Sequence, residues 1–203
     1  MMSEKKQTIH VVDDDEAMRD SMTWLLESEG YKVACYDSAA SFLAARNDRM
    51  RGCIVLDVRM PEMSGLELHE KLEALGSRLP IIFVTGHGDV PMAVSALQRG
   101  ACDFIEKPFN NEDLLSRIRR ALELDSQLSA RQQRNSAIAH RLEQLTQRER
   151  EVMQLVVAGK LNKQVADELD ISMKTVEAHR ARVMEKMGVR TLAELVKAVM
   201  TVN

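Results

Sequence analysis

The chain has 203 residues, of which 45% are hydrophobic, so it has enough material for one large or two smaller domains with buried cores and is not disordered. No stretch approaches the roughly 18 consecutive apolar residues of a membrane span, and the N-terminal residues lack the apolar stretch of a signal peptide, so we expect a cytoplasmic protein without a membrane partner. The net charge of −3 is unevenly distributed. Residues 1–124 carry 15 basic and 21 acidic side chains (net −6), residues 146–203 carry 10 basic and 8 acidic side chains (net +2), and the 21 residues between them add +1. An acidic first part and a mildly basic last part predict two modules with different partners.

From residue 8 onwards, short apolar runs alternate with amphipathic stretches. The runs are rich in Val, Ile or Leu, which is typical of strands buried on both faces of a parallel sheet. The predicted strands are Thr8–Val12, Lys32–Tyr36, Cys53–Leu56, Ile81–Val84 and Asp103–Glu106. The predicted helices are Glu16–Ser28, Ala39–Arg46, Gly65–Leu75, Pro91–Arg99 and Glu112–Leu124. Five strand-then-helix repeats predict a flavodoxin-like, doubly wound α/β domain with a parallel five-stranded sheet over residues 1–124.

A polar segment, residues 125–145, follows this domain. It favours helix and contains neither Pro nor Gly, so it extends the fifth helix or forms a semi-rigid linker. The three cysteines of the chain all lie in or beside apolar runs of the first domain, without ligand-like spacing, which argues against disulfides and zinc.

Residues 146–203 contain helical patterns and no strand pattern. Thr146 and Glu149 have capping-box spacing and begin a helix that ends before Gly159. The later elements are a short helix over Lys163–Leu169, a turn at Asp170 and Ile171, a longer helix from a Ser172 cap to Met187, and a last helix over Leu192–Met200 after a Thr191 cap. This order predicts an all-α, four-helix domain with a helix-turn-helix, whose longer helix enters the major groove of DNA.

Polar side chains stand at the carboxyl ends of the predicted strands, where open α/β sheets bind their ligands. Asp13 and Asp14 follow the first strand, Asp57 the third, Thr85 the fourth and Lys107 the fifth. Clustered carboxylates attract a hard dication such as Mg²⁺, and a carboxylate can act as the nucleophile that forms an aspartyl phosphate. The metal and the lysine would then stabilise the charge on the transferring phosphoryl group.

These residues carry a resemblance to a known family. The segments VVDDD, LDVRMPEMSG, FVTGHGD and FIEKPF resemble the receiver domain of bacterial two-component response regulators, and TGHGDVPMAV with GACDFIEKPF resembles the FixJ subfamily. The resemblance implies that Asp57 accepts phosphate from a sensor histidine kinase. It implies a Mg²⁺ site formed by Asp14, Asp57 and the backbone carbonyl of Arg59, with Asp13 acting largely through water.

The resemblance also implies roles for the last two strands. Thr85 and Phe104 form the switch pair, Thr85 and Lys107 complete the catalytic pocket, and the peptide bond between Lys107 and Pro108 is cis. Two points stay open. The first is whether Asp14 or Asp15 instead caps the first helix, and the second is the role of His87. His87 could tune hydrolysis of the acyl phosphate, although a loop histidine without that role is the simpler interpretation.

The segment LTQREREVMQLVVAGKLNKQVADELDISMKTVEAHRARVMEKMGV resembles the LuxR/NarL-type DNA-binding domain. The resemblance implies that Glu177, Ala178 and Ala181 face base edges, and that Glu177 accepts from a cytosine amino group or rejects wrong contacts. The candidates for phosphate contacts, which position a protein without specifying sequence, are Lys163, Lys174, Thr175, His179, Arg180 and Arg182.

The whole chain thus resembles a transcriptional response regulator whose partners are a histidine kinase, promoter half-sites in double-stranded DNA and RNA polymerase. Phosphorylation would draw Thr85 inward, with Phe104 following into the space that it leaves. The changed surface would then promote a homodimer or release the output domain, and either change would raise the affinity for paired half-sites. An aspartyl-phosphate hydrolase is a poor alternative, because it needs an acid two residues after Asp57 and Arg59 stands there, so we expect no enzyme. The remaining alternative is a phosphorelay or protein-interaction module whose helical domain binds protein.

Overall fold

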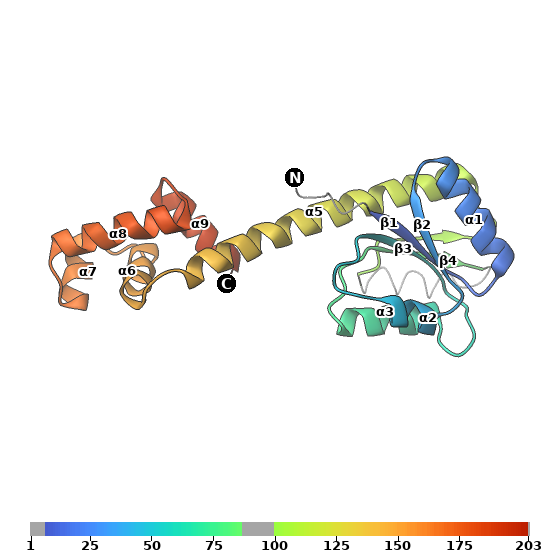
Figure 1. Ribbon diagram of the computed structural model, residues 1–203, viewed down its shortest axis with the longest axis horizontal. Coiled ribbons are helices and arrows are strands. Elements are labelled where there is room, and N and C mark those ends of the chain that lie inside the picture. Colours follow the sequence, from blue (N-terminus) through green and yellow to red (C-terminus); the bar gives the residue numbers. More distant parts are fainter. Residues whose placement is uncertain (1–6, 87–99, 203) are drawn as a thin grey trace. The chain divides into compact units, whose positions relative to one another are not determined.

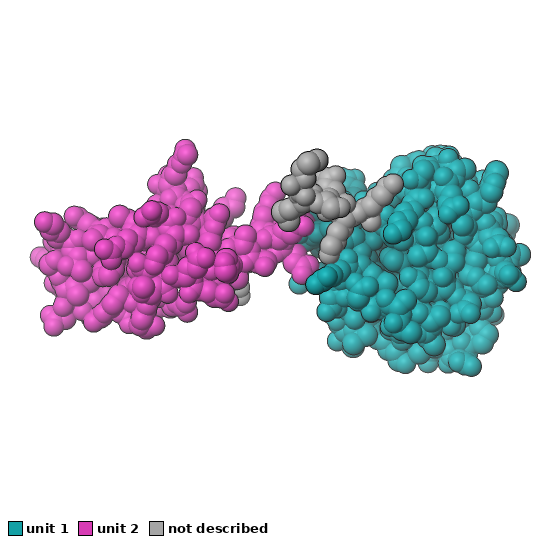
Figure 2. All heavy atoms as spheres, in the orientation of Figure 1, with its two compact units in different colours: residues 1–129 teal, residues 130–203 magenta. Residues whose placement is uncertain are grey.

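The computed structural model describes residues 7–86 and 100–202. The chain divides into two compact units, residues 1–129 and residues 130–203, which are described separately (Figure 2). The predicted helix Pro91–Arg99 and the candidate His87 lie outside the described residues. None of the helices in the described ranges is long and apolar enough to cross a membrane.

The first unit contains a five-stranded sheet in which all pairs are parallel and the strand order is β2-β1-β3-β4-β5. The strands are β1 (Thr8–Val12), β2 (Lys32–Tyr36), β3 (Gly52–Asp57), β4 (Ile81–Thr85) and β5 (Asp103–Glu106). The helices are α1 (Glu16–Ser28), α2 (Ala39–Ala45), α3 (Gly65–Ala74) and the first part of α5 (Asn111–Glu143). The predicted doubly wound fold is confirmed, with β3 and β4 slightly longer than expected.

The sheet is covered on both faces (Figure 1). One core cluster combines Val11 and Val55 with residues of α1 and α5, and the other combines Val12 and Leu56 with residues of α2 and α3. Neighbouring residues of one strand therefore enter opposite clusters, as the two-residue period of a strand requires. Because both faces are apolar, the polar side chains that the strands carry are confined to their ends.

One polar residue inside a strand is an exception. His10 of β1 is buried, and its ring lies edge-on to Phe42 at a centroid distance of 5.9 Å, while its Nδ1 lies 3.4 Å from the Tyr36 hydroxyl. Burial lowers the pKa of His10 below its ordinary value. The neutral imidazole is therefore the form that the fold stabilises.

Helix α5 continues well beyond the predicted end at Leu124, as far as Glu143. The predicted linker is thus largely an extension of the fifth helix, the first of the two alternatives that its composition allowed. Within the first unit, Leu114 and Ile118 of α5 are buried in the core. Within the second unit, Ile138 and Leu142 of the same helix pack against a different core cluster.

A buried ion pair holds α5 at the end of the sheet where the strands begin. The Asp125 carboxylate accepts from Arg51 Nε at 3.0 Å and from Gln7 Nε2 at 2.8 Å, and Arg51 Nη2 lies 2.9 Å from Asp125 Oδ2. The side chain of Asp125 is 7% exposed and that of Arg51 is 23% exposed. Three segments that are distant in sequence thus meet on one carboxylate.

The second unit is all-helical, as predicted. After the last part of α5 it contains α6 (Gln147–Val157), α7 (Asn162–Leu169), α8 (Met173–Met187) and α9 (Leu192–Val202) (Figure 1). The predicted caps are confirmed: Thr146 and Glu149 form a reciprocal capping box, Ser172 accepts from the Thr175 amide, and Thr191 accepts from the Glu194 amide. Asp170 adopts a left-handed conformation with φ 52° and ψ 51°, which makes the turn between α7 and α8.

Candidate functional site

The carboxyl ends of the strands bring two acids and one lysine together. Asp57 is the last residue of β3, Asp13 follows β1 and Lys107 follows β5. The ammonium Nζ of Lys107 lies 2.7 Å from Asp57 Oδ1 and 3.1 Å from Asp13 Oδ2. Asp13 and Asp57 are buried, with 2% and 7% of their surface exposed. A single ammonium therefore bridges two buried carboxylates.

The electrostatics of this cluster favour a reactive carboxylate. Burial raises the pKa of Asp57, the Asp13 charge acts in the same direction, and the hydrogen bond and charge of Lys107 oppose them. Burial alone would lower the pKa of Lys107, but its hydrogen bond to Asp57 and the charges of both acids raise that pKa overall. The lysine is thus held as a cation beside a carboxylate that is more basic than usual, which suits a nucleophile.

The loop after β3 is shaped around Asp57. The Arg59 amide donates to Asp57 Oδ2 at 2.8 Å, which fixes the second carboxylate oxygen. Gly65 begins α3 against the Asp57 backbone, and a Cβ at this position would lie 2.2 Å from the Asp57 carbonyl oxygen. Only glycine therefore lets the loop return so closely to the end of β3.

The three consecutive acids after β1 have three different surroundings. Asp13 is buried and accepts from the Asp15 amide at 2.9 Å. Asp15 is the N-cap of α1, and its Oδ1 accepts from the Ala17 amide at 2.9 Å. Asp14 is exposed and forms no hydrogen bond with any of the described residues. Of the two residues that could have capped α1, Asp15 does so, which leaves Asp14 available to bind a ligand.

The predicted switch residues lie on neighbouring strands. Thr85, the last residue of β4, is fully buried, and its Oγ1 has no hydrogen-bond partner among the described residues. Phe104 of β5 is half-buried and packs against the cluster on the α2–α3 face. The Lys107 amide donates to the Thr85 carbonyl at 2.7 Å, and the peptide bond between Lys107 and Pro108 is cis, as the resemblance implied.

The residues of the pocket fit a divalent cation. Asp13, Asp14 and Asp57 carry three negative charges and Lys107 carries one positive charge, so a dication would balance the cluster. In residues 7–86 and 100–202, no three acidic, His or Cys side chains converge into a metal cage. Mg²⁺ does not need one, because it typically takes one or two carboxylates and completes its shell with water and phosphoryl oxygens. The unpartnered Thr85 hydroxyl is a further polar group that a bound oxyanion would satisfy.

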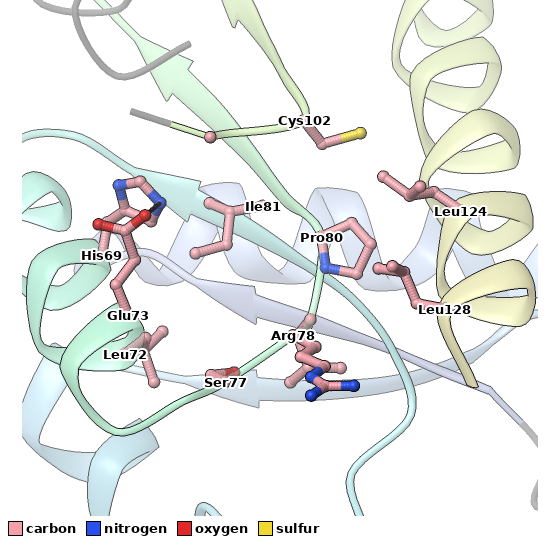
Figure 3. Close-up of a pocket in the computed structure, with 12 residues that line it drawn as sticks. His69, Leu72, Glu73, Ser77, Arg78, Pro80, Ile81, Cys102, Leu124 and Leu128 are labelled. Atoms are coloured by element: carbon pink, nitrogen blue, oxygen red, sulfur yellow. Dashed lines mark ion pairs between the residues drawn. The ribbon is translucent and has the colours of Figure 1, made fainter. Parts of the chain in front are cut away.

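A second hollow of the first unit lies away from these acids. It has a volume of about 220 Å³ and lies between α3, the start of β4 and α5 (Figure 3). Its walls combine apolar residues such as Ile81 and Leu128 with the His69–Glu73 pair, whose closest atoms are 3.8 Å apart. None of the predicted site residues lines this hollow.

In the second unit, α8 separates an exposed face from a buried one. Lys174, Glu177, Ala178, Ala181 and Arg182 are exposed and follow the i, i+3, i+4, i+7, i+8 spacing of one helix face. Val176, Val183 and Met187 are buried on the other side. The predicted base-facing residues and two of the predicted phosphate contacts thus share one accessible surface.

The other predicted DNA contacts are more constrained. The Thr175 hydroxyl lies 2.8 Å from the Ser172 hydroxyl at the start of α8, and the Arg180 guanidinium donates to Asn162 at the start of α7. His179 is half-buried, and its Nδ1 has no partner among the described residues. Lys163 is exposed on α7. The Asn162–Arg180 contact was not predicted, because nothing in the local sequence relates residues 18 positions apart.

Comparison with known families agrees with this division. Residues 9–119 match the family described as "Response regulator receiver domain", and residues 143–199 match "Bacterial regulatory proteins, luxR family". The chain belongs to the bacterial response regulators with a LuxR-type DNA-binding domain.

Individual response regulators match over nearly the whole chain. It is 46% identical to the response regulator protein TodT of Pseudomonas putida, over 97% of this chain and 86% of that protein. It is 47% identical to the transcriptional regulatory protein FixJ of Azorhizobium caulinodans, over 93% and 90%. Among solved structures, it matches the response regulator StyR with a TM-score of 0.85 at 43% identity, over 96% of this chain and 98% of StyR. Full-length FixJ from B. japonicum matches with a TM-score of 0.60 at 45% identity, over 97% of both chains.

Membership of this family determines the broad function. The chain is a DNA-binding response regulator of a two-component system, and therefore a transcription regulator and not an enzyme. Its partners are a sensor kinase and DNA. The alternative of a helical domain that binds only protein finds no support in these relatives.

Proposed function

We propose that Asp57 is the phosphoacceptor and that its phosphorylation by a sensor histidine kinase controls DNA binding by α8. The observation that carries this proposal is the single Lys107 ammonium that bridges the buried carboxylates of Asp57 and Asp13. Asp57 is the acid of this pair that ends the central strand β3, and its raised pKa suits a nucleophile.

In the reaction, a carboxylate oxygen of Asp57 attacks the phosphorus of the phosphohistidine. The bond between phosphorus and the histidine nitrogen breaks, the electron pair leaves with the imidazole, and an acyl phosphate forms on Asp57. Lys107 stays protonated and stabilises the charge of the phosphoryl oxygens. The buried hydroxyl of Thr85 then donates to a phosphoryl oxygen, and Phe104 moves into the space that Thr85 leaves.

Mg²⁺ would be held by the carboxylates of Asp14 and Asp57 and the backbone carbonyl of Arg59, with Asp13 acting through water. When bound, it supplies charge neutralisation for the phosphoryl group. The exposed, unpaired Asp14 supports its role as a direct ligand, because its side chain loses no hydrogen bond to a described residue on binding.

In the second unit, the exposed face of α8 would enter the major groove. Glu177, Ala178 and Ala181 would face base edges, and Lys174 and Arg182 at the margins would contact phosphates. Lys163, Thr175, His179 and Arg180 would add phosphate contacts around this face. Because residues 146–203 carry a net charge of only +2, a homodimer on two half-sites would supply the affinity that one domain lacks. The bound dimer would act in the cytoplasm on RNA polymerase.

The test is phosphorylation by acetyl phosphate in the presence of Mg²⁺. The wild type should gain one base-labile phosphoryl group, and Asp57→Asn should gain none, because an amide is not a nucleophile. Asp15→Asn is the matched control: it keeps the α1 cap, lies outside the Lys107 cluster and should label fully. Full labelling of Asp57→Asn would refute the assignment. Labelled and unlabelled protein are then compared for binding to promoter DNA by gel shift.

A further inference from the structure

The C-terminal end of α8 is capped by a residue from outside the helix-turn-helix. Arg141 of α5 donates from Nη1 to the backbone carbonyl of Met187 at 2.8 Å. Met187 is the last residue of α8, so its carbonyl has no donor from within the helix. The positive guanidinium is also favoured there by the negative end of the helix dipole.

Gly188 makes room for this contact. It is the C-cap of α8, with φ 64° and ψ 36°. A Cβ at this position would lie 2.9 Å from Nη1 and 3.2 Å from Cζ of Arg141. The glycine therefore serves two purposes, because it adopts the left-handed conformation and lets the guanidinium lie directly against the helix end.

A second contact holds the same end of α8. Lys186 Nζ lies 2.6 Å from the Glu149 carboxylate and 3.2 Å from the Gln144 carbonyl. Glu149 is buried, and its carboxylate also accepts from the Thr146 amide in the capping box of α6. The hydrogen bond from Lys186 lowers the pKa of Glu149, so this carboxylate stays ionised. The end of α8 is thus tied to the start of α6 and to the segment just after α5.

Apolar contacts reinforce the arrangement. Ile138 and Leu142 of α5, and Leu145 after it, belong to the same cluster as Val183 and Met187 of α8. The last turns of α5 are therefore part of the core against which the recognition helix packs. Arg141 lies on these turns, between Ile138 and Leu142.

We propose that Arg141 is a positioning residue for DNA recognition, which acts through the Met187 carbonyl and does not touch DNA. Ser172 fixes the first turn of α8 and Arg141 fixes the last. Together they set the position of α8 along its axis and its rotation about that axis, and hence the position of its exposed face. Base-edge hydrogen bonds require placement to within about 0.5 Å, whereas flexible side chains can follow a phosphate over a greater distance. Loss of Arg141 should therefore reduce sequence-specific binding much more than non-specific binding.

The experiment uses the full chain and two DNA duplexes, one selected from a random library by the wild type and one with the same bases scrambled. Arg141→Ala should lower affinity for the selected duplex by about tenfold, as expected for loss of a charge-assisted hydrogen bond. Affinity for the scrambled duplex should change by less than about twofold, and the salt dependence should stay the same because no phosphate contact is lost. Arg141→Lys, which keeps a cation that can reach the carbonyl, should recover part of the selected-duplex affinity.

Arg148→Ala is the matched control. It removes the same charge from the same unit, but Arg148 forms an exposed ion pair with Glu151, 3.0 Å away. This variant should leave the ratio of specific to non-specific affinity unchanged.

Three results would overturn the proposal. Equal losses on both duplexes with a weaker salt dependence would show that Arg141 contacts phosphate. Equal losses of affinity with unchanged salt dependence, together with a lower melting temperature by far-UV circular dichroism, would show that Arg141 only stabilises the domain. An Arg141→Ala variant with wild-type affinity for the selected duplex would show that the contact has no role in recognition.

Discussion

The buried pair of Arg51 and Asp125 allows a quantitative prediction for the first unit. Asp125→Ala removes the carboxylate that accepts from both Arg51 and Gln7. Arg51, whose side chain is 23% exposed in the intact pair, then loses the acidic partner that it has among the described residues. Removing one partner of a fully buried ion pair destabilises a protein by about 3–5 kcal/mol. Because Arg51 keeps partial access to water, we expect a loss of about 2–4 kcal/mol in the free energy of unfolding of this unit.

The assay takes advantage of the distribution of aromatic residues. All Trp, Tyr and Phe residues of the chain lie between Trp24 and Phe109, so near-UV circular dichroism reports on the first unit without interference from the second. Unfolding in urea is followed by the near-UV circular dichroism signal for the wild type and for Asp125→Ala. The double variant Arg51→Met with Asp125→Leu is the control, because an apolar pair of similar volume should be much less destabilising than the single change. A loss below about 1 kcal/mol for Asp125→Ala would show that the pair stabilises no more than a surface ion pair.

Three further predictions concern other residues. Because burial lowers the folded-state pKa of His10, its neutral form stabilises the first unit fully above the unfolded-state pKa of about 6.5. As the pH falls from there towards the folded-state pKa, the free energy of unfolding should decrease by at most about 1.4 kcal/mol per pH unit and then level off, and His10→Gln should reduce this loss when urea midpoints are compared at pH 7.5 and 5.5. Asp14→Ala should abolish Mg²⁺ affinity in a titration and Asp13→Ala should weaken it less, so equal affinities for wild type and Asp14→Ala would contradict the ligand assignment. Glu177→Ala should relax the sequence preference at one base pair by about 1–3 kcal/mol. Arg182→Ala should instead weaken the affinity for all DNA sequences alike and lower the salt slope by about one per subunit. A uniform loss of affinity in Glu177→Ala would contradict this orientation of α8.

The parts of this molecule that the sequence predicts are those set by local patterns. Apolar runs identify the five strands, and the rule that ligands bind at strand ends brings Asp57 and Lys107 together although they are 50 residues apart. Capping residues mark where α6, α8 and α9 begin, whereas α7 follows Leu161, which makes no side-chain cap. The end of α5 could not be predicted, because a polar segment without Gly or Pro is compatible with both a helix and a linker. The contacts of Asp125 and Arg141 could not be predicted either, because each depends on a partner that is distant in sequence and has no local pattern of its own.

The separation of the two faces of α8 has a consequence for the evolution of such regulators. Substitutions at exposed positions such as Glu177 and Ala178 change what the helix reads, and exposed surface changes typically alter stability by less than about 0.5 kcal/mol. The buried side, with Val176 and Val183, keeps the domain folded while these positions vary. A duplicated gene can therefore acquire a new set of target promoters in a few substitutions, and the protein stays folded after each one. Such independence lets paralogous regulators diverge within one genome without first losing their structure.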